Sequence, residues 1–222
     1  MKKYILIILS FFTFRNSFSQ AITWKPTIGI NTSIQNVSKT GNNKIKAGLD
    51  LGIKLEIPLR KNMGLEMGYF YSQNSSYLER RFVYPFIVYF DLPVVKEDFK
   101  LRFLKVPLLL ILKQNHDKPG IIGLGGVIKY NFSSYRDGIF VDRNETYSSK
   151  FTIDTESGNK VGVGLQAAIG KEFSIKKNKF SLGLYYDVDL SKWRYPTNFD
   201  LEKKIYYSLR SHNLSLLLSW IL

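Results

Sequence analysis

The feature that most constrains the fold is a strict alternation of apolar and polar residues, which is clearest between residues 45 and 59. One parity holds only aliphatic side chains, such as Leu49 and Leu51, whereas the other holds glycine, proline and charged residues such as Lys54 and Glu56. Successive side chains of a β-strand point to opposite faces, so one face of this segment is apolar and the other is charged. A segment this long with faces this different predicts a strand that crosses a membrane.

The same alternation recurs along the chain. The predicted strands are 27–34, 45–59, 63–72, 101–112, 121–132, 161–173, 179–190 and 209–222. The connections are short at 60–62, 113–120 and 174–178, intermediate at 35–44, and long at 73–100, 133–160 and 191–208. Outer-membrane barrels have short periplasmic turns and long extracellular loops, with an even number of strands. We therefore expect an all-β fold, an eight-stranded antiparallel up-and-down transmembrane β-barrel of the OmpA/OmpX-like kind.

The polar parity of these strands is expected to line the inside of the barrel. Over the spans 28–34, 45–59, 63–71, 104–112, 122–130, 161–173, 180–190 and 214–222, the polar parity holds ten charged residues, whereas Lys171 is the one charged residue on the apolar parity. The interior of an eight-stranded barrel has room only for side chains, and buried charges need partners, so a packed polar network is favoured over a solute channel. The residues predicted to form this network are Lys46, Asp50, Lys54, Glu56, Glu66, Lys105, Lys129, Glu172, Asp187 and Asp189.

Two alternatives remain open from these patterns. A soluble barrel of the lipocalin type would turn the apolar parity inward, but soluble strands average about 5–6 residues and these are longer. Asp187 and Asp189 share the inner face and could bind a cation, although hard cations take six or more oxygens and pairing with Lys or Arg is favoured. We therefore predict no metal, no cofactor and no catalytic residue.

The N-terminus has the pattern of an export signal. Lys2 and Lys3 precede an apolar run over residues 4–14, and small residues follow at Ser17 and Ser19. The run is too short for a bilayer helix, which needs about 20 apolar residues. We expect residues 1–19 to be cleaved after Ser19 or Gln20, which leaves residues 20–222 as one barrel domain in the cell outer membrane.

The amino-acid composition limits the kinds of partner that we expect. The chain has no cysteine, so an exported protein of this kind relies on packing or on a bilayer for stability. Its formal charge is +14. An exported chain seldom meets nucleic acid, so we expect outer-membrane lipids and the phosphates of lipopolysaccharide to be the anionic partners. The chain is expected to be a monomer.

The segment 73–100 is too apolar for an ordinary solvated loop. It either continues its flanking strands as a hairpin beyond the membrane or forms a surface that binds a protein partner, because large exposed apolar patches usually bind something. The candidate recognition residues are Arg80, Arg81, Tyr84, Phe86, Tyr89 and Phe90.

From residue 63 onward the chain resembles the PorT family of outer-membrane barrels. Residues 103–110, Phe-Leu-Lys-Val-Pro-Leu-Leu-Leu, are similar to the family's Tyr-Leu-Glu-Ile-Pro-Leu-Leu-Leu signature, and residues 64–73 resemble its preceding strand, which ends in Tyr-Ser-Gln. Residues 161–164 and 182–186 resemble its later glycine-rich hairpin. The resemblance implies a barrel. The family's namesake is implicated in the export of surface proteins through the type IX system, but most relatives have no assigned task, so that role is not transferred to this chain.

The chain departs from the family's pattern at two places, at Leu222, where an aromatic terminus is usual, and at Lys105 within the signature. The family's Glu is Lys105 in this chain, whereas a Leu-Glu-Ile-Pro-Leu copy with Glu56 occurs earlier. Both side chains are predicted to point inward near the periplasmic end, so an ion pair between them across the barrel is one expectation.

Together these patterns predict a non-enzymatic outer-membrane scaffold whose extracellular loops bind a partner or a surface ligand. One alternative is a component of a protein secretion apparatus, as the PorT resemblance implies. Another is a lipid-modifying barrel enzyme that uses Ser211 and His212. The enzyme is disfavoured because His212 shares the parity of the lipid-facing residues and no acid at a suitable spacing orients it.

Overall fold

The computed structural model describes residues 22–37, 41–81, 94–114, 120–141, 148–154, 160–196 and 206–222. These residues form ten strands. The strands are β1 Thr23–Val37, β2 Gly41–Arg60, β3 Met63–Arg81, β4 Val94–Lys113, β5 Gly120–Val141, β6 Ser148–Asp154, β7 Val161–Ile175, β8 Asn178–Asp189, β9 Trp193–Pro196 and β10 Tyr206–Ile221. No helix in the described ranges is long and apolar enough to cross a membrane.

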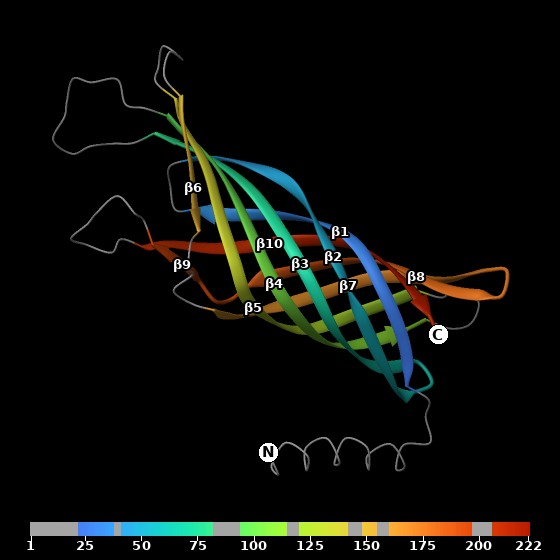
Figure 1. The fold of residues 1–222 in the computed structure, drawn as a ribbon. Coiled ribbons are helices and arrows are strands. Elements are labelled where there is room, and N and C mark those ends of the chain that lie inside the picture. The colour runs from blue at the N-terminus through green and yellow to red at the C-terminus, as the bar shows by residue number, and fades with distance from the viewer. Residues whose placement is uncertain are drawn as a thin grey trace, which may run out of the picture.

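Eight of these strands close into a barrel. Neighbours pair in the order β1-β2-β3-β4-β5-β7-β8-β10, all antiparallel, and β10 pairs back onto β1 to complete the ring. Figure 1 shows the strands wound around one axis, with the C-terminus at the same end as the hairpin between β7 and β8. The predicted eight-stranded antiparallel barrel is therefore confirmed.

The two faces of the wall have the predicted polarity. Leu49, Leu184 and Leu216 are 38–42% exposed on the outside, whereas Lys54 and Asp187 are buried inside, at 2% and 1% exposure. A wall that is apolar outside and charged inside suits a surrounding of hydrocarbon, because ions must then find partners within the barrel. The lipocalin-type alternative, with the apolar face inward, is wrong.

Aromatic side chains mark both edges of the apolar belt. At the short-turn end, Phe173 and Phe180 stack with their ring centroids 5.8 Å apart. At the long-loop end, Tyr71 and Phe132 lie with centroids 6.0 Å apart, and Tyr130 is 42% exposed nearby. Such girdles form where a barrel meets the two membrane–water interfaces.

The strands at the long-loop end are longer than the alternation predicted. The pairing of β3 with β4 continues to Arg81 and Val94, and the pairing of β4 with β5 continues to Val94 and Val141. This extension favours the hairpin interpretation of segment 73–100 over a loop, up to the residues that are described. Only the predicted strand bounds were too short. Both faces of a strand beyond the membrane meet water, so the alternation that identifies a spanning strand fades there.

Two short strands lie inside segments that were predicted to be loops. Strand β6 pairs with the part of β5 at the long-loop end, and β9 pairs with the part of β10 at the same end. Within the membrane β5 pairs instead with β7, and β10 pairs with β8. The wall therefore divides at the long-loop end: the sheet of β3, β4, β5 and β6 projects at the upper left of Figure 1, apart from β9 and β10.

Candidate functional site

Among the described residues, ion pairs form four groups along the length of the barrel interior. The first lies at the short-turn end, where Lys25 of β1 donates to Glu56 of β2. Lys113 of β4 lies between two acids, with its Nζ 2.6 Å from Oε1 of Glu56 and 2.9 Å from Oε1 of Glu172. Four strands on different sides of the ring are thus joined by charge across the interior.

The second group lies further into the barrel. Lys54 Nζ donates to the hydroxyl of Tyr185 at 2.7 Å, and this hydroxyl donates to Oε1 of Glu66 at 3.1 Å. The Lys54 ammonium is also 4.7 Å from the centre of the Tyr185 ring. Tyr185 therefore fills space and links the two members of a buried ion pair, Lys54 and Glu66, by hydrogen bonds.

The third group surrounds two acids on β8. Lys129 of β5 donates to Asp187 and, at 2.6 Å, to Asp189. Lys105 of β4 lies 3.2 Å from Asp187 and 3.8 Å from Asp50. Because these acids are held by lysines, the cation interpretation of Asp187 and Asp189 loses support, and the described residues contain no group of acids, histidines or cysteines suited to a metal ion.

Amide side chains complete this third group. Asn31 donates to Oδ1 of Asp50 at 2.8 Å, and Asn213 donates to Oδ1 of Asp187 at 2.7 Å. Asn74 bridges to Asn213 at 2.8 Å. These residues come from β1, β3 and β10, so neutral hydrogen bonds tie three further strands to the acids of the third group.

Trp193 closes the interior toward the long-loop end. Its side chain is 1% exposed, and its indole N–H donates to Oδ2 of Asp189 at 2.8 Å. The ring packs on Phe103, with centroids 5.1 Å apart. A Cβ atom at Gly162 would lie 2.5 Å from the Trp193 ring, so the glycine provides the space that the indole occupies. Residues that follow β8 thus fold inward and cover the network.

A fourth ion pair lies nearer the open mouth. Lys46 of β2 donates to Asp98 of β4 at 2.6 Å, and both side chains are partly exposed. At the long-loop end this pair meets solvent, as the pair of Lys113 and Glu172 does at the short-turn end, and the buried groups lie between them.

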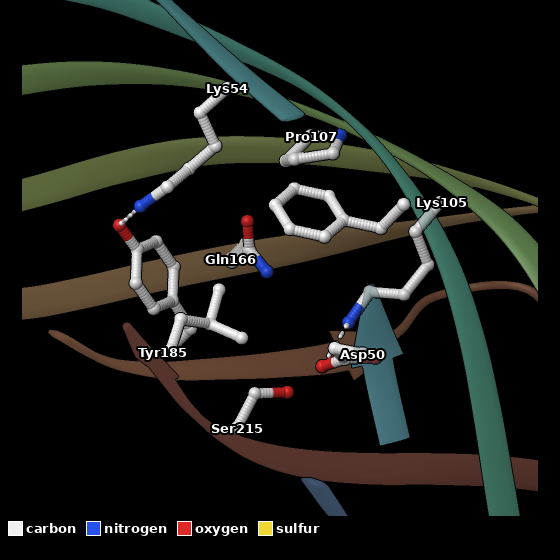
Figure 2. Close-up of a pocket in the computed structure, with 9 residues that line it drawn as sticks. Asp50, Lys54, Lys105, Pro107, Gln166, Tyr185 and Ser215 are labelled. Atoms are coloured by element: carbon white, nitrogen blue, oxygen red, sulfur yellow. Dashed lines mark hydrogen bonds and ion pairs between the residues drawn. The ribbon is translucent and has the colours of Figure 1, made fainter. Parts of the chain in front are cut away.

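The space left among these side chains is small. A cavity of about 10 Å³ lies between the second and third groups, where Asp50, Lys54, Lys105 and Tyr185 surround it. Figure 2 shows these side chains converging from opposite walls, with Gln166 and Ser215 beside them. Because about 10–15 Å³ is needed to hold one water molecule, this cavity has room for about one water molecule and not for a larger solute.

Sequence reasoning identified the inward parity correctly but missed some members and some pairings. It missed Lys25, because the strand was expected to begin after Pro26, and Lys113, which was assigned to a turn. The expected pair between Glu56 and Lys105 is wrong: Glu56 pairs with Lys25 and Lys113, and Lys105 pairs with Asp187 and Asp50. Pairing across a barrel depends on the stagger between strands, which periodicity alone does not reveal.

Ser211 and His212 do not come together. Ser211 is buried inside, where its hydroxyl donates to Asp189 at 2.7 Å. His212 lies on the outer face, with its Nδ1 2.7 Å from the hydroxyl of Tyr186. Neighbouring residues of a strand point to opposite faces, so the serine and histidine cannot form a nucleophile–base pair.

The candidate recognition residues lie at or beyond the described end of the β3–β4 hairpin. Arg80 and Arg81 are the last residues of β3, and their backbones pair with Val95 and Val94. The remaining candidates lie outside the described residues; they are Tyr84, Phe86, Tyr89 and Phe90.

The closed ring, the exposed apolar belt and the ion-paired interior define an integral membrane β-barrel. The sequence matches the model of the outer membrane protein beta-barrel domain family over residues 16–212, and the chain belongs to this family. It is therefore an outer-membrane β-barrel protein. No curated protein matches the sequence.

Solved structures of small outer-membrane barrels are similar to this chain. Ail, the attachment invasion locus protein of Yersinia pestis, is 12% identical, with 90% of this chain and 99% of that chain covered and a TM-score of 0.40. Neisserial surface protein A is 13% identical, with 90% and 99% covered and a TM-score of 0.43. OprG of Pseudomonas aeruginosa is 12% identical, with 91% and 97% covered and a TM-score of 0.45.

Proposed function

We propose that the chain is a non-enzymatic, monomeric outer-membrane scaffold that binds a protein partner or a surface ligand through its long-loop end. The observation that carries this proposal is the continuation of β3, β4 and β5 as a paired sheet beyond the aromatic girdle. Strands β4 and β5 contain 20 and 22 residues. A strand needs about 9–11 residues to cross the hydrocarbon, so roughly half of each strand projects outside.

The projecting sheet offers a surface suited to binding. Strand β6 pairs with β5 along one edge, and within the described residues its other edge has no strand beside it. An unpaired edge presents backbone donors and acceptors that an extended peptide can join. The interior supports the same proposal, because a packed ion-pair network stabilises the anchor and gives no route for transport.

We further propose that the apolar segment between β3 and β4 makes the contact. Aromatic and arginine side chains dominate the binding energy of protein interfaces, and this segment supplies both. The proposed contact residues are Arg80, Arg81, Tyr84, Phe86, Tyr89 and Phe90.

Photo-cross-linking on intact cells tests this proposal. A benzophenone amino acid replaces Tyr84 or Tyr89 in separate variants, and Leu165 on the lipid-facing wall is the control position. We expect discrete protein-sized adducts from the two hairpin positions and none from position 165. Lipid adducts or no adducts at both hairpin positions would contradict a partner-binding role.

A second candidate function is supported by the Phe103–Leu110 segment on β4. Its resemblance to the PorT signature favours a component of a type IX-like secretion apparatus. Purification of the tagged chain from membranes in mild detergent should then co-isolate other secretion components, and deletion should remove secreted surface proteins from the culture. A chain that purifies alone, with an unchanged set of surface proteins, would contradict this candidate.

We also propose that residues 1–19 form a cleaved export signal. The mature protein isolated from outer membranes should begin at Gln20 or Ala21, as N-terminal sequencing would reveal. An intact Met1 in that fraction would show that the segment is retained.

A further inference from the structure

The hairpin between β7 and β8 carries an unusual density of positive charge at the short-turn end. We call residues 171–179 the basic hairpin. Its four lysines, Lys171, Lys176, Lys177 and Lys179, are all exposed. The turn itself is tight, since Lys176 adopts a φ of 55° in the left-handed region. The β7–β8 hairpin projects at the right of Figure 1, and the four exposed lysines are carried by this one short segment.

This charge is not neutralised within the basic hairpin. Glu172 is the only acid in the segment, and it points into the barrel, where it accepts from Lys113 at 2.9 Å and lies 3.5 Å from Lys25. Within the described residues the four lysines lie outside all the ion pairs of the interior network. Because Glu172 is paired inside the barrel, the basic hairpin keeps its net positive charge.

The position of the basic hairpin relative to the apolar belt is given by a row of aromatic residues. Phe173 pairs with Phe180, and Phe180 pairs with Trp220, so three adjacent strands carry an aromatic ring at one level. Ile175 beyond this row is still 55% exposed. Rings of this kind lie at the level of the lipid headgroups. The ammonium groups next to them consequently lie where lipid phosphates lie.

Lys171 extends the same surface toward the hydrocarbon. It lies on the lipid-facing parity of β7, and it pairs with Leu182, which is 43% exposed on the outer wall. A lysine in this position covers apolar surface with its methylene chain and directs its ammonium to the nearest headgroups. The surface is therefore continuous with the belt that already contacts lipid.

We propose that the basic hairpin and its aromatic row form a binding site for anionic phospholipid in the inner leaflet of the outer membrane. The lysines contact the phosphate of the headgroup, and Phe173, Phe180 and Trp220 contact the glycerol and upper acyl region. Charge complementarity and continuity with the lipid-facing belt both select this occupant. The site lies at the opposite end of the barrel from the proposed partner-binding sheet, so the two proposals can fail separately.

The turn between β2 and β3 provides an internal control. It also exposes two cations, Arg60 and Lys61. No aromatic residue occurs between positions 57 and 66, so no ring lies within three residues of either cation along this hairpin. Comparison of the two turns therefore separates a local site from a general effect of positive charge at this end.

Fluorescence quenching of Trp220 measures binding at the site directly. Trp24 is replaced by Phe, and Trp193 is shielded inside the barrel, so the remaining lipid-accessible signal comes from Trp220. The barrel is reconstituted in phosphatidylcholine bilayers that contain either dibrominated phosphatidylglycerol or dibrominated phosphatidylcholine at equal mole fraction. The measured quantity is the association of the anionic lipid relative to the zwitterionic lipid.

We expect the parent to prefer phosphatidylglycerol and K177S/K179S to lose about tenfold or more of that preference, since each basic residue near an anionic surface contributes about a fivefold effect. K177R/K179R should keep the preference, and R60S/K61S should change it by less than about twofold. Heat-modifiable migration on a gel checks that each variant is folded. Equal quenching by both lipids in the parent, or equal losses in K177S/K179S and R60S/K61S, would overturn the proposal.

Discussion

The part of the barrel inside the membrane and the part beyond it use the same strands in different ways. Within the membrane β5 pairs with β7 and β10 pairs with β8, and the enclosed charges are matched by partners. Beyond the membrane β5 pairs with β6 and β10 pairs with β9, so the ring is no longer continuous there. A closed ring is required only where hydrocarbon surrounds the backbone, and water allows the strands to separate into projecting sheets.

The largest expected effect comes from removing a buried cation from the membrane part. Lys129→Met leaves Asp189 without its lysine and Asp187 with only Lys105. Loss of one partner from a buried ion pair costs about 3–5 kcal/mol, because the remaining charge is uncompensated. Equilibrium urea unfolding in detergent should reveal this loss. A change below about 1 kcal/mol would mean that the interior charges are well solvated.

An intermediate effect is expected where the interior is closed. Gly162→Ala places a Cβ atom 2.5 Å from the Trp193 ring, so the indole must shift. Overpacking of this kind costs about 1–3 kcal/mol. In a double-mutant cycle the cost of Gly162→Ala should fall when Trp193 is replaced by Phe, because the smaller ring leaves space. If the free-energy costs of the two substitutions simply added, the cost of Gly162→Ala would not come from contact with the Trp193 ring.

The smallest expected effect concerns the ion pair at the mouth. The Lys46 and Asp98 side chains are 41% and 34% exposed, so water already solvates both charges. Lys46→Ser should therefore lower the free energy of unfolding by about 1 kcal/mol or less in the same urea titration. A loss as large as that for Lys129→Met would show that the mouth is as closed as the centre.

The same contrast explains what could be predicted from the sequence. Alternation identified all eight spanning strands and the inward direction of Lys54 and Asp187, because lipid outside and crowding inside impose opposite demands on the two faces. It did not reveal β6 or β9, since strands in water have no such demand. It also could not assign Lys105 to Asp187 rather than to Glu56, because partners across a ring depend on how far each strand is staggered.

The seam between β1 and β10 has a consequence for the charged centre of the barrel. Thr27 pairs with Ser219, which joins the first strand to the last, and β10 also supplies Asn213 to Asp187 and Ser211 to Asp189. A chain that ends before β10 would leave two open edges and would remove one neutral donor residue from each carboxylate, although Lys129 would still face both acids. The last strand therefore has two roles at once, because the same residues that close the ring also complete the hydrogen bonds of its charged centre.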